Sequence, residues 1–178
     1  MALTLTRDSN LVKRYSEAIG WLVECSSTGA WVTDAAWTTM PRMSAPKIKP
    51  NEETAELKDG SGATIYQSAT LDSYEFTVDL LQADKNTMDL AEYARDKYFM
   101  LLYLVGTVGD KQQIQVFAPG NISSTSEADY SDFVKVGFTF KSTRNDSAIT
   151  ISTLPSYITS AITQAVIPAN KQRIIIEA

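Results

Sequence analysis

Tyr74-Glu75-Phe76-Thr77-Val78-Asp79-Leu80 decides the fold, because apolar side chains alternate along it with polar or charged ones. This two-residue period is that of a β-strand with one buried face and one solvated face. Two later stretches, 113–117 and 133–141, alternate in the same way. The unbroken apolar run 98–105 predicts a further strand before both of them. We therefore expect a mainly β protein with antiparallel strands.

One helix is expected within this framework. Asp84 is a suitable N-cap, and the side chains on one face of 84–98 recur at helical spacing: Thr87, Leu90, Ala91, Ala94 and Tyr98. The small alanines on this face would let the helix lie close against a sheet. The predicted fold class is mainly β with one principal helix (α+β): an antiparallel β-sandwich or barrel flanked by an α-helix, with an extended loop and terminal arms.

The 178 residues fit a single domain, which we predict over 1–178. Prolines recur within 40–63, so we predict a long irregular loop or arm there, and Asp59-Gly60-Ser61-Gly62 has the composition of a hairpin tip.

Residues 155–178 are predicted as a C-terminal arm. It begins with a weakly helical stretch and ends in an apolar strand, 173–178, which must pair with a sheet edge of its own subunit or of a neighbour.

Two further stretches carry local predictions. Residues 19–25 fit either a helix or a strand with a glycine bulge; we favour the strand, with Ala30–Thr33 as its hairpin partner. Ala118–Asn121 is predicted to end the strand that contains 113–117, and the serine-rich segment 123–126 to form a loop in solvent.

Composition excludes several classes of site. The chain has no histidine and one cysteine, Cys25, which rules out an intramolecular disulfide, a His/Cys zinc site and any nucleophile that needs a histidine base. The carboxylates Asp79, Asp84 and Asp89 diverge on the predicted elements, so we expect them to cap or to be solvated. We predict no enzymatic activity, no cofactor and no metal.

The balance of 16 basic and 21 acidic residues gives a net charge of −5, so the chain lacks the basic field that generic nucleic-acid binding requires. No apolar stretch approaches the ~20 residues of a membrane span. The first residues lack the pattern of a signal peptide, and we expect synthesis in a cytosol.

Glu75, Thr77 and Asp79 share the polar side of the strand that decides the fold. In a single subunit this side is an ordinary solvent face. In a closed ring it would line the lumen, with Lys135 and Lys141 on the later strand partly offsetting the acidic charge.

The block from Tyr66 to Ser142 resembles the tube-forming proteins of tailed bacteriophages and related injection machines, the family of the major tail tube protein. The resemblance lies in the order of elements: strand 73–81, helix 84–98, strand 98–105 and strand 133–142. In that family, subunits form hexameric rings with a continuous β-barrel channel and a helix outside the barrel. The resemblance implies a structural virion protein that self-assembles into stacked rings forming the tail tube, through which DNA passes.

The resemblance also implies roles for particular segments. Residues 40–63 would reach the next ring, Glu75, Thr77 and Asp79 would face a predominantly acidic lumen, and subunit contacts would involve Ile48, Ile174, Ile175 and Ile176. The implied partners are copies of the chain itself, other tail proteins such as the tape measure and the terminator, and double-stranded DNA in non-specific passage. No membrane is involved, and the protein would be made in the host cytoplasm and reside in the virion tail.

Other interpretations remain open. The chain would also suit a head-to-tail connector or a secreted injection-system tube subunit, since both form rings. A monomeric β-barrel that binds a small apolar ligand is a third interpretation, and an enzyme acting through carboxylates is a fourth.

Overall fold

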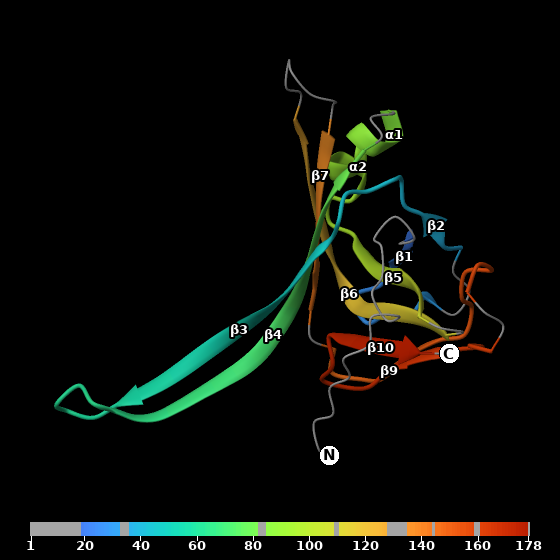
Figure 1. Ribbon diagram of the computed structural model, residues 1–178. Coiled ribbons are helices and arrows are strands. Elements are labelled where there is room, and N and C mark those ends of the chain that lie inside the picture. Colours follow the sequence, from blue (N-terminus) through green and yellow to red (C-terminus); the bar gives the residue numbers. More distant parts are fainter. Residues whose placement is uncertain are drawn as a thin grey trace.

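The computed structural model describes residues 19–32, 36–81, 85–108, 111–127, 135–143, 145–158 and 161–177. Strands dominate it (Figure 1): β1 (Ile19–Cys25), β2 (Thr38–Thr39), β3 (Lys47–Lys58), β4 (Thr64–Leu80), β5 (Tyr98–Val108), β6 (Lys111–Glu127), β7 (Lys135–Ser142), β8 (Ile149–Ile151), β9 (Ala165–Ile167) and β10 (Arg173–Glu177). Two short helices, α1 (Lys85–Met88) and α2 (Leu90–Tyr93), lie between β4 and β5. The predicted antiparallel, mainly β character is confirmed.

The main sheet has eight strands. Seven follow the order β2-β1-β5-β6-β7-β4-β3, and β10 pairs with β6 beside this path. Strands β8 and β9 form a second, two-stranded sheet. The main sheet is open: β2 and β3 stand at its two ends, and among the described residues they do not pair with each other. The sheet therefore does not close into a barrel within one chain.

Strand β5 lies at the centre of the core and is buried on both faces. Met100, Leu102 and Leu104 enter one hydrophobic cluster, which β1, β6, β8 and β9 complete. The alternate residues Leu101 and Tyr103 enter a second cluster, which is completed by β4 and β7. Because both faces of β5 are covered by apolar side chains, its residues do not alternate between apolar and polar. This explains the unbroken apolar run in the sequence.

Strand β6 corrects the prediction that Ala118–Asn121 ends a strand. It continues to Glu127, because it changes partner at Gly120: the residues before it pair with β5, and those after it pair with β7. A Cβ at Gly120 would collide with the backbone carbonyl of Lys141, so the glycine permits the close approach of β7. The serine-rich segment predicted as a loop is therefore strand, paired with β7.

The single helix predicted over 84–98 is also corrected. The described part contains α1 and α2, separated at Asp89, and Asp84 lies outside the described residues. Asp96 adopts a φ of 59°, the left-handed conformation, which turns the chain into β5. Thr87 and Ala94 are buried and Leu90 packs partly on the second cluster, so the helical face was predicted in part.

The two ends of the described chain agree with the predictions in part. Residues 19–25 form strand β1 as predicted, but its partners are β2 and β5. Of the predicted hairpin partner Ala30–Thr33, the described residues 30–32 form a turn. The weak helical pattern after Pro155 was misleading, since the chain there makes turns and then β9. Strand β10 pairs with β6 of the same chain, one of the two alternatives predicted for the C-terminal strand.

Candidate functional site: a polar sheet face and a projecting arm

The predicted polar positions Glu75, Thr77 and Asp79 lie on one face of β4, and the neighbouring strands extend this face. Cross-strand pairing places Lys49 and Lys141 on either side of Glu75, and Lys47 and Thr139 on either side of Thr77. Pairing with β6 extends these rows to Asn121 and Ser123. We call this surface of β3, β4, β7 and β6 the polar face.

The reverse of the same four strands is apolar. Phe76, Phe138 and Phe140 are fully buried there, and Ile48 and Ile122 pack partly against them. Ile48 was predicted as a subunit contact, and in this chain it is paired opposite Phe76 within its own core. The four strands are therefore amphipathic, with the core on one side and solvent on the other.

The polar face carries more lysines than carboxylates among its described side chains. Its described side chains include four lysines (Lys47, Lys49, Lys135 and Lys141) and two carboxylates (Glu75 and Asp79), which gives 4 − 2 = +2. The sequence alone did not place Lys47 and Lys49 here, because the segment that carries them was predicted to be irregular. Alternation in Lys47-Ile48-Lys49 was the signal that could have found them.

Both edges of this four-stranded unit are open. Strand β3 has β4 on one side and, among the described residues, no strand on the other. On β6, pairing with β5 ends at Gly120, so residues 121–127 are paired with β7 alone. Unpaired backbone N–H and C=O groups along a strand are a template for a further strand.

The predicted loop at 40–63 is instead largely the first strand of a long hairpin, which projects from the body (Figure 1). We call its outer part, 51–73, the arm. A bulge marks its base: Asn51 pairs with Ser73 but Glu52 pairs with Leu71, which leaves Asp72 as the extra residue. A bulge bends a strand and increases its twist, and this one lies where the arm leaves the body.

The predicted hairpin tip at 59–62 is confirmed. The Asp59 carboxylate accepts hydrogen bonds from the backbone N–H groups of Ser61 and Ala63, each at 2.9 Å, and from the Ser61 hydroxyl at 2.6 Å. These bonds lower the pKa of Asp59, and the bond from the Ser61 hydroxyl has the largest effect. Gly62 adopts a φ of 86°, a backbone conformation that other residues rarely adopt.

The arm is acidic and carries exposed apolar side chains. It contains five carboxylates and one lysine, for a net charge of 1 − 5 = −4 (Glu52, Glu53, Glu56, Asp59, Asp72 and Lys58). Leu57 and Tyr66, which are paired across the two strands, are 57% and 61% exposed. Side chains of this kind at the end of a projecting hairpin are typical of a contact with another molecule.

The three C-terminal isoleucines divide between core and surface. Ile174 and Ile176 pack on the first hydrophobic cluster, while Ile175 is 59% exposed. Of the predicted subunit contacts, Ile175 is thus the one that the described structure leaves open to solvent.

Metal binding and thiol chemistry have little support among the described residues. These residues contain no group of three or more His, Cys, Asp or Glu side chains that could hold a metal ion. Cys25 is buried, and burial, aided by the charge of Glu24, raises its thiol pKa to about 12, so the thiolate nucleophile is suppressed. None of the helices in the described part of the chain is long and apolar enough to span a membrane.

A scan against models of known protein families finds no match, and a search of curated proteins finds none either.

Proposed function

We propose that this chain is the subunit of a self-assembling tube, a structural protein of a phage tail whose stacked rings form the channel for DNA. The observation that carries the proposal is the four-stranded unit β3-β4-β7-β6, which has one polar face, one face sealed by its own core and two open edges. Such a unit gains backbone hydrogen bonds by adding copies of itself.

The number of strands in the unit supports closure into a ring. All neighbours in it are antiparallel, so β3 and β6 run in opposite directions. When the open edge of β6 meets the open edge of β3 in the next copy, the new pair is antiparallel as well. Every junction is then equivalent, and a ring of such junctions is a closed assembly with no free edge.

Burial supports one orientation of the subunits in such a ring. The apolar reverse, with Phe76, Phe138 and Phe140, is covered by β5 and its neighbours in every subunit, so that bulk must lie outside. The polar face with Glu75, Thr77 and Asp79 then lines the lumen. Six copies would give roughly 24 strands and, from strand spacing and tilt, a backbone diameter of about 45–50 Å. Such a channel admits a DNA duplex.

The mixture of charges on the polar face suits a channel through which DNA passes without being bound. Glu75 is the cross-strand neighbour of both Lys49 and Lys141, so each of these lysines has a carboxylate beside it. One carboxylate offsets part of the charge of these two lysines, and partly offset lysines contribute less to phosphate binding than uncompensated ones. Hydroxyl and amide side chains occupy several other positions of the face, among them Thr77, Thr139, Ser123 and Asn121.

The arm supplies contacts between rings. It extends about 25 Å past the bulge at Asp72, as its strand length implies. The copies within a ring are joined through the sheet edges, which leaves the arm free to reach the ring above or below. Ile175 remains a proposed contact with neighbouring subunits, and tape-measure and terminator proteins are proposed as partners in the tail.

Electron microscopy of the concentrated chain tests this proposal. We expect negatively stained rings and tubes with a central channel, and a matching early peak in gel filtration. In a matched variant, residues 52–72 are replaced by the two-residue turn Asn-Gly, which joins Asn51 to Ser73 without the arm. This variant should still form rings but not long tubes. A chain that stays monomeric at high concentration would overturn the proposal, and single rings from the intact chain would favour a connector.

A further inference from the structure

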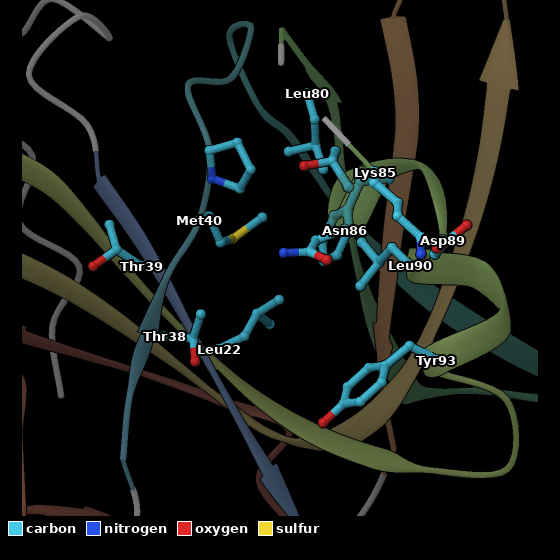
Figure 2. A pocket seen from close by; sticks show the side chains of 13 residues that line it. Leu22, Thr38, Thr39, Met40, Leu80, Lys85, Asn86, Asp89, Leu90 and Tyr93 are labelled. Atoms are coloured by element: carbon cyan, nitrogen blue, oxygen red, sulfur yellow. The ribbon is translucent and has the colours of Figure 1, made fainter. Parts of the chain in front are cut away.

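An open pocket of about 630 Å³ lies among β1, β2, the end of β4, β7 and the two helices (Figure 2). Its walls are largely apolar and include Leu22, Met40, Leu80, Leu90 and Phe138. Its volume lies within the range of pockets that take drug-sized ligands. An apolar pocket of this size to which a few polar groups converge is the usual form of a small-molecule site.

The apolar walls of this pocket belong to the folded core. Leu80 and Phe138 are buried on β4 and β7, and Met40 is 7% exposed. The backbone N–H of Met40 donates a hydrogen bond to the carbonyl of Gly20 on β1 at 2.8 Å, which fixes Met40 beside that strand. Paired strands and core side chains therefore give the pocket its shape before any ligand enters.

One hydrogen-bonding side chain points into this apolar space. Asn86 of α1 extends its carboxamide toward Met40 (Figure 2). Within the described part of the chain, this carboxamide has no hydrogen-bond partner. Because a carboxamide both donates and accepts, it can pair with a carbonyl, a hydroxyl or an amide of a ligand.

The charged side chains at the pocket offset each other. Lys85 and Asp89 are the charged residues among the described lining, so its net charge is 1 − 1 = 0. The Lys85 side chain extends toward Asp89 and not into the pocket (Figure 2). An ion that entered the apolar space would lose its hydration without meeting an opposite charge there. The pocket therefore favours a neutral ligand.

We propose that this pocket binds a neutral small molecule with a largely apolar body and one hydrogen-bonding group, which pairs with Asn86. The inference goes beyond the proposed tube and does not depend on it. Leu80 and Phe138 lie on the apolar side of β4 and β7, opposite the polar face, so the ligand would lie outside the proposed channel.

Fluorescence titration of the subunit with Nile red tests the site. Nile red is a neutral, largely apolar dye with one carbonyl group, and its emission rises in apolar surroundings. We expect saturable binding of one dye per chain, at protein concentrations below those of tube assembly. Leu90→Trp, which fills the pocket, should weaken binding at least about tenfold. Val166→Trp, at an exposed position of β9, is the matched control and should leave binding unchanged.

Two further measurements test the chemistry of the ligand. Asn86→Ala removes the carboxamide and should weaken Nile red binding about fivefold, the effect of one neutral hydrogen bond. Gln67→Ala, which removes an exposed carboxamide from the arm, is its control. Anilinonaphthalene sulfonate, an anionic dye of similar size, should bind the unmodified chain at least about fivefold more weakly than Nile red. Circular dichroism of each variant checks the fold.

Each part of the proposal has an outcome that would overturn it. Absence of saturable Nile red binding, or an equal loss in Leu90→Trp and Val166→Trp, would remove the site. Unchanged binding by Asn86→Ala would remove the pairing with Asn86, and equal or tighter binding of the anionic dye would remove the neutral ligand class.

The variant in which Asn-Gly replaces residues 52–72 separates the pocket from the exposed apolar side chains of the arm. It should bind Nile red as the unmodified chain does, and loss of binding would place the dye on the arm and overturn the proposal. All these titrations use the free subunit. Their failure would leave the tube proposal standing, and a chain that binds the dye but never assembles would overturn the tube alone.

Discussion

The guanidinium of Arg173 lies 4.2 Å from the centre of the Tyr74 ring, and this contact ties the C-terminal strand to the base of the arm. The same guanidinium donates a hydrogen bond to Gln115 Oε1 at 3.0 Å. Next to it, the buried Gln172 donates its side-chain amide to the carbonyl of Leu71 at 3.0 Å, at the bulge. Arg173 of β10 and the preceding Gln172 therefore both contact the base of the arm.

Replacing Arg173 with alanine should loosen this connection. We expect the free energy of unfolding to fall by about 1–2 kcal/mol, from the lost cation–π contact and hydrogen bonds. Hydrogen exchange should accelerate in the arm more than in β5. Lys171→Ala, at an exposed position nearby, is the control and should change neither quantity. Equal protection of the arm in all three proteins would show that β10 does not hold it.

Substitution of Gly120 should disrupt the point at which β6 changes partner. In Gly120→Ala the new methyl group collides with the backbone of Lys141, which cannot move without separating β6 from β7. We expect a loss of at least about 2–3 kcal/mol in the free energy of unfolding, measured by urea titration. Gly60→Ala at the hairpin tip, where no atom lies within 4 Å of the new Cβ, should be close to neutral. Similar midpoints for the two variants would refute this account of Gly120.

Reversing the two carboxylates of the polar face should affect passage and not assembly. Glu75→Lys with Asp79→Lys changes the charge of the described face from +2 to +6 per subunit, while the apolar reverse is untouched. We expect normal tubes, but stronger retention of DNA that weakens with salt, and at least about a tenfold loss of DNA delivery. Asp146→Lys, at an exposed turn, is the control. Delivery at the unmodified level would exclude this face from the lumen.

The carboxylate of Glu24 connects β1 to the helical segment and should make stability depend on pH. It accepts hydrogen bonds from the Tyr93 hydroxyl at 2.9 Å and from the Lys97 ammonium at 3.2 Å, and both lower its pKa from the ordinary value of 4.5. The stabilisation is therefore present above pH 4.5 and is lost as the pH falls through the lowered pKa of the folded state.

Because the pair is partly exposed and screened by solvent, its contribution to the free energy of unfolding is small. Glu24→Gln should reduce the free energy of unfolding near neutral pH, and the two proteins should converge in acid. Chemical denaturation across the pH range measures the difference. A gap that persists at low pH would mean that the side chain acts through packing and not through its charge.

Much of the sheet could be predicted from the sequence because local alternation reports burial directly. The segment 74–80 gives the buried and solvated faces of β4, and Asp59 with its neighbouring glycines gives the hairpin tip. Prediction failed at 118–121, where Pro119 and Gly120 have the composition of a strand end. They are tolerated inside β6 because Gly120 makes room for a second strand, and that strand is distant in sequence.

The sequence by itself determined the antiparallel class, the polar side of β4 with Glu75, Thr77 and Asp79, and the lack of histidine-dependent chemistry, since these depend on residue type and local period alone. Only the tertiary structure decided that Lys47 and Lys49 join this side, that the prolines of 41–50 lead into an arm, and that β10 returns to its own chain. The reason is physical: pairing between strands far apart in the chain is set by the edge that each strand finds, and local sequence does not encode that choice.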